Sequence, residues 1–93
     1  TPLYFTPIKV LLKTLAHFKS TSSMTDKLRR ARHIDLATMR DLRLNYCVTM
    51  TLEKDARKPH FAEIIWRITT RGREILNDYK GYEDKNEYTL PSQ

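Results

Sequence analysis

The sequence predicts a small α+β domain whose elements follow the order α-α-α-β-β-α. Apolar residues recur at helical spacing in three segments before residue 46 and alternate with polar residues in two segments between residues 47 and 69. Helical spacing then returns and continues to Gly81. A chain of 93 residues has room for one core. We therefore expect one domain over residues 1–81 and a flexible polar tail over residues 82–93.

The first expected helix begins at Pro7 and ends near Lys19. Thr6 is a natural N-cap, and proline suits the first helical position because its missing N–H has no partner there. Five apolar residues fall on one helical face: Ile8, Leu11, Leu12, Leu15 and Phe18. This stripe predicts that the helix packs against the core.

Two shorter helices are expected next. One begins at Ser23 and ends near Arg32, and three of its residues share an apolar face: Met24, Leu28 and Ala31. The other runs from Asp35, a good N-cap, to Asn45, which is expected to end it in a left-handed conformation. Its apolar stripe is predicted to contain Leu36, Met39, Leu42 and Tyr46. Its opposite side is predicted to contain Ala37, Thr38, Asp41 and Asn45.

The alternating segments predict a β-hairpin over residues 47–69. Its first strand carries Val48, Met50 and Leu52 on one face, and its second carries Ile64, Trp66 and Ile68. The polar segment 53–60 between them is expected to form a long basic loop. The last helix is expected to begin at Thr69 or Thr70. Within the fold, Trp66 and Cys47 are expected to be core residues, and Gly72 to allow close packing on the hairpin.

The charge distribution favours a polyanionic partner. The net charge is +6, and residues 1–33 hold seven basic side chains but one acidic side chain. No apolar segment reaches the roughly 20 residues of a membrane-spanning helix, so no membrane association is expected. The single cysteine and the absence of a signal-peptide pattern favour the cytoplasm.

The sequence shows no pattern typical of an enzyme. It has two glycines, too few for a phosphate-binding loop. Cys47 and the histidines at 17, 33 and 60 lack the spacing of metal ligands, and no acidic cluster suits a catalytic metal. We expect no catalytic residues, no metal and no cofactor.

The order of elements resembles that of winged helix-turn-helix domains over residues 6–80. The segments 24–32 and 35–45 resemble the two helices of the motif, and the hairpin resembles the wing. The segment Ile68–Leu76 resembles the Thr-x-x-Gly junction through which the second wing strand enters a C-terminal helix. The short strand that usually precedes the second helix has no clear counterpart here, beyond a residue or two of Ser20–Ser23.

This resemblance implies a sequence-specific double-stranded DNA-binding protein, a small transcriptional regulator that acts as a homodimer. The third helix would enter the major groove. Thr38 and Arg40 are the candidates for contacts to base edges, and Ala37 for contact with a thymine methyl group. The expected phosphate contacts are Lys27, Arg29, Arg30 and Arg43. At the wing tip, Arg57, Lys58 and His60 are expected to contact phosphate or the minor groove.

Other functions fit the same residues. The basic run Arg29–Arg32 also suits RNA. A protein–protein adaptor would use the tail as a partner site, and Asp41 on the outer face of the third helix would favour that function over DNA binding. A third alternative is a tail-mediated dimer that binds DNA through Lys9, Lys13 and His17 of the first helix.

Overall fold

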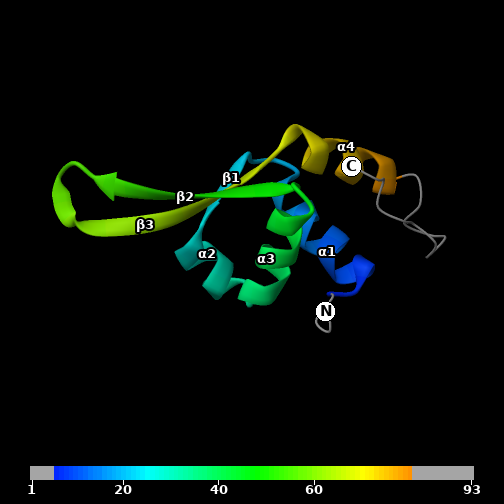
Figure 1. Cartoon of the computed structure of the whole chain (residues 1–93), viewed down its shortest axis with the longest axis horizontal. Helices are drawn as coiled ribbons and strands as arrows, with labels where there is room; N and C mark the ends of the chain where they lie inside the picture. The colour runs from blue at the N-terminus through cyan, green and yellow to red at the C-terminus, as the bar shows by residue number, and fades with distance from the viewer. Residues whose placement is uncertain (1–5, 81–93) are drawn as a thin grey trace.

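The computed structural model describes residues 6–80, and their fold is α+β, as predicted. It combines four α-helices and one 3-10 helix with a three-stranded antiparallel sheet over these residues (Figure 1). The elements are α1 (Ile8–Leu15), η1 (Ala16–Phe18), β1 (Ser23–Thr25), α2 (Asp26–Ala31), α3 (Leu36–Leu44), β2 (Val48–Asp55), β3 (Lys58–Ile68) and α4 (Thr70–Lys80). The predicted polar tail lies outside the described residues.

The central strand of the sheet is β3, in the order β1-β3-β2. Trp66 pairs with Met24 of β1 on one side and with Met50 of β2 on the other. Its side chain is 1% exposed, which confirms it as a core residue. The core around it comes mainly from α1, α3 and α4, so the helices bury one region of a sheet that is longer than they are.

The strand β1 was not predicted. Ser23 was expected to begin a helix, but Ser23–Thr25 is extended and pairs with β3. The second helix therefore begins three residues later, where the Thr25 hydroxyl accepts a hydrogen bond from the Leu28 N–H at 3.1 Å. Met24 is buried in the core as a strand residue, whereas Leu28, predicted to share its helical face, is 39% exposed.

The apolar stripe of the first helix is confirmed, although its boundaries differ. Leu11, Leu12, Leu15 and Phe18 are buried, the last of them in the 3-10 turn η1. Pro7 is the N-cap and not the first helical residue. Its carbonyl accepts hydrogen bonds from the backbone N–H groups of Val10 and Leu11 at 2.9 and 3.1 Å.

Both α2 and α3 end in a non-glycine residue with a left-handed backbone. These residues are His33 (φ 58°) and Tyr46 (φ 60°). In each case the following residue donates its N–H back into the helix, Ile34 to the Arg29 carbonyl and Cys47 to the Leu42 carbonyl, which is the Schellman pattern. The prediction that Asn45 takes this role is wrong, since its φ is −88°.

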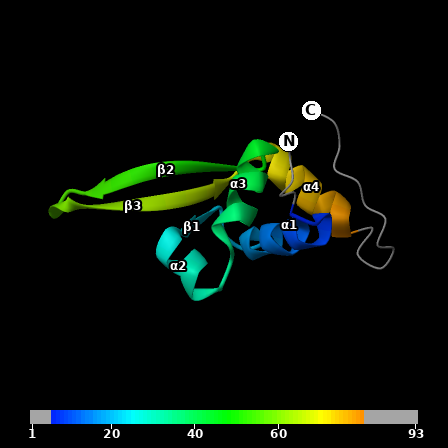
Figure 2. The ribbon, with the colours of Figure 1, turned by 60° about the horizontal axis from the view of Figure 1, so that its bottom comes forward.

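The strands of the hairpin are longer than predicted, and the loop between them is shorter. Residues 53–60 were expected to form a loop, but β2 and β3 continue through most of them and only residues 56 and 57 form the turn. The pairing runs from Val48 opposite Ile68 to Lys54 opposite Ala62, followed by a shift of register. The hairpin projects well beyond the helices in both views (Figures 1 and 2).

The junction between β3 and α4 depends on Gly72, as predicted. A Cβ atom there would overlap the Cys47 carbonyl oxygen and lie 2.7 Å from Ile68 Cγ1. The Thr69 hydroxyl accepts from the Gly72 N–H at 3.0 Å and donates to the Tyr46 carbonyl at 2.6 Å. The start of α4 is thereby fixed against the end of α3.

We predict that Gly72→Ala lowers the free energy of unfolding by about 2 kcal/mol, because the obstructing atom belongs to backbone and cannot rotate away. Asn77→Ala, at an exposed position of the same helix, should change it by less than about 0.5 kcal/mol. Urea unfolding followed by circular dichroism measures both. Equal stability of the two variants would contradict the close packing at Gly72.

Candidate nucleic-acid interface

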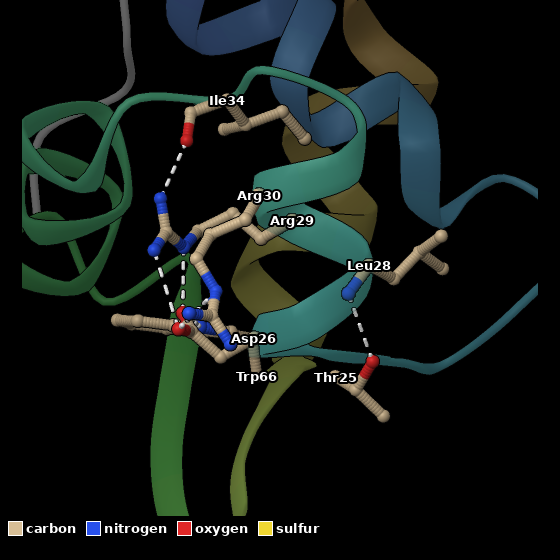
Figure 3. A network of polar contacts seen from close by, with 7 residues as sticks. All are labelled: Thr25, Asp26, Leu28, Arg29, Arg30, Ile34 and Trp66. Atoms are coloured by element: carbon tan, nitrogen blue, oxygen red, sulfur yellow. Dashed lines mark hydrogen bonds and ion pairs between the residues drawn. The ribbon is translucent and has the colours of Figure 1, made fainter.

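The carboxylate of Asp26 connects α2 to the central strand. Its Oδ1 atom accepts hydrogen bonds from Arg29 Nε at 2.6 Å and from Trp66 Nε1 at 3.0 Å, and its Oδ2 atom accepts from Arg29 Nη2 at 3.2 Å (Figure 3). Arg29 Nη1 donates in turn to the Ile34 carbonyl at 2.7 Å. One network therefore joins α2, β3 and the turn that leads into α3.

This network overturns the prediction that Arg29 contacts phosphate. Arg29 is 9% exposed, and its guanidinium already donates hydrogen bonds to Asp26 and to the Ile34 carbonyl. The neighbouring Arg30 behaves differently: its side chain is 68% exposed, with Nε 3.6 Å from Asp26 Oδ2. Of these two adjacent arginines, only Arg30 is available to an external ligand.

Four basic side chains line a groove of about 670 Å³ between α2 and the hairpin. They come from Lys27, Arg30, Lys54 and Lys58. Its other lining residues are Glu53, Phe61, Ala62, Glu63 and Ile65. Glu53 is neutralised by Arg67, whose Nη2 atom lies 2.9 and 3.1 Å from its two carboxylate oxygens. The groove is therefore positively charged on balance.

A second basic surface lies on the outer side of α3. Ala37, Arg40 and Arg43 are exposed there, as the DNA-binding prediction requires. Thr38 is 4% exposed and packs inward beside Met39, so its assignment to a base-reading role is wrong. The buried stripe of α3 is rotated from the predicted one.

Because the buried side of α3 differs from the predicted one, some of its apolar residues are exposed. Leu36 and Tyr46 were expected to be buried but are 40% and 62% exposed. Leu44 is 73% exposed, and with Arg40, Arg43 and Tyr46 it lines a shallow depression of about 430 Å³. The outer side of α3 is thus both basic and apolar.

Asp41 was expected to project from this outer side, where it would repel phosphate. It is only partly exposed, and its Oδ2 atom accepts a hydrogen bond from the Thr6 N–H at 2.8 Å. The carboxylate holds the segment that precedes α1. Asp41 therefore interacts with Thr6 and does not project freely from the outer side of α3.

The end of the hairpin carries the remaining predicted residues. Arg57, Lys58 and His60 are all exposed, Arg57 in the turn and the other two on β3. Sequence reasoning missed two neighbours, Lys54 and Phe61. The ammonium of Lys58 lies 5.7 Å from the centre of the Phe61 ring, and Phe61 is 68% exposed. An aromatic residue directly after the predicted polar loop was the signal that could have identified it.

The cysteine and the histidines form no further site. Cys47 is fully buried, and burial raises the pKa of its thiol. Partial desolvation, and then the charge of Arg32, lower the pKa of His17. Among residues 6–80, no three His, Cys, Asp or Glu side chains are placed to hold a metal ion.

Comparison with protein-family models, curated proteins and solved structures found no match to this chain. The helices of the described region are all too short or too polar to cross a membrane.

The hydrogen bond from Arg29 is the largest cause that holds the pKa of Asp26 below its usual 3.8, with Trp66 and the charges of Arg29 and Arg30 contributing. A depressed folded-state pKa adds stability that is present above the unfolded-state pKa and lost as the pH falls through the folded value. We predict that the stability advantage of the wild type over Asp26→Asn shrinks below about pH 4. Urea unfolding of both proteins across this range measures it. A pH-independent difference would contradict the ionised network.

The two adjacent arginines form a matched pair. Arg29→Met should lower the free energy of unfolding by about 3 kcal/mol, since it leaves a poorly solvated carboxylate without its partner. Arg30→Ala should lower it by less than about 1 kcal/mol, because this ion pair is long and exposed. Thermal denaturation distinguishes them, and comparable losses would contradict the structural role of Arg29.

Proposed function

We propose that this chain is a winged helix-turn-helix protein that binds double-stranded DNA sequence-specifically, as a homodimeric transcriptional regulator. In this proposal α2 and α3 are the helix-turn-helix, and the β2–β3 hairpin is the wing. The unexpected strand β1 favours this fold, because it supplies the short strand before the second helix that the sequence lacked. A dimer would read half-sites about 34 Å apart.

The observation that carries the proposal is the outer side of α3. Arg40 and Arg43 are exposed on it, while Met39 and Leu42 on the inner side are buried in the core. A helix fixed by its inner side can enter the major groove as a rigid unit. Arg40 is proposed to contact a base edge, Ala37 a thymine methyl group and Arg43 a phosphate.

The hairpin supports the proposal through its charge. Arg57, Lys58 and His60 are exposed at its far end. In this arrangement they contact the DNA backbone beside the groove that α3 occupies. Lys27 and Arg30 of α2 are proposed to contact phosphates near the base of the wing.

A protein–protein adaptor is the second candidate, and the exposed apolar residues of α3 favour it. Leu44 and Tyr46 form an apolar surface beside the arginines. A partner with acidic and apolar residues would fit this surface. The adaptor function requires no binding to DNA, so a duplex-binding measurement distinguishes the two.

We predict that the chain binds duplex DNA with an affinity that falls steeply as salt rises, because phosphate contacts release counterions. Arg40→Ala should weaken binding to a selected target by about tenfold or more. Arg43→Ala should weaken binding to all sequences and reduce the salt slope by about one. Fluorescence anisotropy against salt measures all three.

Lys13→Ala is the control for these arginines, since it removes one exposed positive charge from α1. It should leave duplex binding nearly unchanged. A larger loss from Lys13→Ala than from Arg40→Ala would indicate binding through the first helix. No binding at low salt would exclude the DNA proposal and leave the adaptor.

A further inference from the structure

The groove between α2 and the hairpin has a composition that duplex binding through α3 does not explain. An exposed aromatic ring, Phe61, lies among basic side chains in it. A duplex keeps its bases stacked inside the helix, so a phosphate-binding surface has no use for an aromatic ring. Unpaired nucleotides are different, because their bases stack on aromatic side chains while cations hold the backbone.

We infer that this groove binds an unpaired nucleotide, with its base stacked on Phe61 and its phosphates held by the surrounding basic residues. The inference goes beyond duplex recognition and does not depend on α3. It assigns single-stranded DNA or RNA as the ligand of this groove, which shares Lys27, Arg30 and Lys58 with the proposed duplex contacts and adds Phe61.

The first support is the exposure of Phe61. Residue Phe61 is 68% exposed, although the chain buries Phe18 and Trp66 almost completely in its core. The Phe61 ring lies on the part of the hairpin beyond the pairing with β1, which ends at Ile65. Nothing in the described core requires an aromatic residue at this position.

The second support is the arrangement of charge around the ring. Lys58 lies over Phe61 at 5.7 Å, on the same strand, and Lys54 lies opposite Ala62 on the other strand of the hairpin. Lys27 and Arg30 approach from α2. Basic side chains of α2, β2 and β3 thus line the groove that contains the ring, and a backbone that runs past a stacked base requires such cations.

The third support is that one of the two acidic residues in the groove is paired with an arginine. Glu53 and Glu63 face each other across the hairpin, where two like charges repel. Arg67 holds Glu53 through its Nη2 atom, and its Nη1 atom donates to the Thr51 hydroxyl at 2.7 Å. With Glu53 paired to Arg67 on the surface of the hairpin, the four basic residues outnumber the one remaining acid, Glu63, in the groove. The volume of about 670 Å³ is large enough for a nucleotide.

The test compares Phe61 with a matched apolar residue of the same hairpin. Leu52 is 63% exposed and does not line the groove. Fluorescence anisotropy would measure the binding of labelled oligothymidylate, oligouridylate and a random-sequence duplex, each twelve nucleotides or base pairs long. Phe61→Ala should weaken binding of at least one single strand by about 5-fold to 100-fold, the effect of one lost stacking contact. Leu52→Ala should change it by less than about twofold.

The same variants separate this inference from the DNA proposal. Phe61→Ala should leave duplex affinity within about twofold, and Arg40→Ala should leave single-strand affinity within the same range. Losses of equal size on single strands and duplex for Phe61→Ala would overturn the stacking site. Equal effects of Phe61→Ala and Leu52→Ala, or no single-strand binding at low salt, would overturn it too.

Phe61→Trp supplies a second readout. Its exposed indole should be quenched when a base stacks on it, whereas the buried Trp66 of the wild type should report no change. Quenching by oligothymidylate or oligouridylate, but not by duplex, supports the site. Binding without quenching would show that the strand lies elsewhere.

Discussion

The carboxylate of Asp26 is the interaction on which the rest of the structure depends. It accepts hydrogen bonds from Arg29 and from Trp66, the residue at the centre of the sheet. Through Arg29 it also fixes the Ile34 carbonyl in the turn between α2 and α3. Charge-assisted hydrogen bonds of this kind are both strong and directional. The helix that carries Arg40 and the sheet that extends into the β2–β3 hairpin are therefore positioned by the same group.

The helical periods of the sequence predicted most of the fold because they report burial. Where one face was buried, as in the first predicted helix, Leu11, Leu12, Leu15 and Phe18 were found in the core and Ile8 packed partly buried against it. The β1 strand was missed because three residues are too few to show a period, and its pairing partner lies some forty residues away. The loop prediction for residues 53–60 failed for a related reason. Beyond the core both faces of the hairpin meet water, so apolar and polar residues have no reason to alternate.

The candidate site was less predictable than the fold because charge alone does not distinguish exposed from buried arginines. Arg29 and Arg30 are adjacent and chemically identical, but one is buried with Asp26 and the other lines the groove. A helical phase error of one residue was enough to misplace Thr38. Phe61 and Lys54 come together with α2 only through the sheet register, which the sequence does not display.

The hairpin itself is the best physical argument for an external ligand. An isolated two-stranded ribbon has little stability in water, and the far part of this one has no helix against it. Cross-strand contacts such as Arg67 with Glu53 stabilise the ribbon only modestly, because both side chains are exposed. Exposed apolar side chains such as Leu52 and Phe61 add nothing to stability where they meet water. A ligand that lies along the hairpin would give a function to the length of the hairpin and to the exposed ring of Phe61. The basic residues around that ring match the negative charge of a nucleic acid.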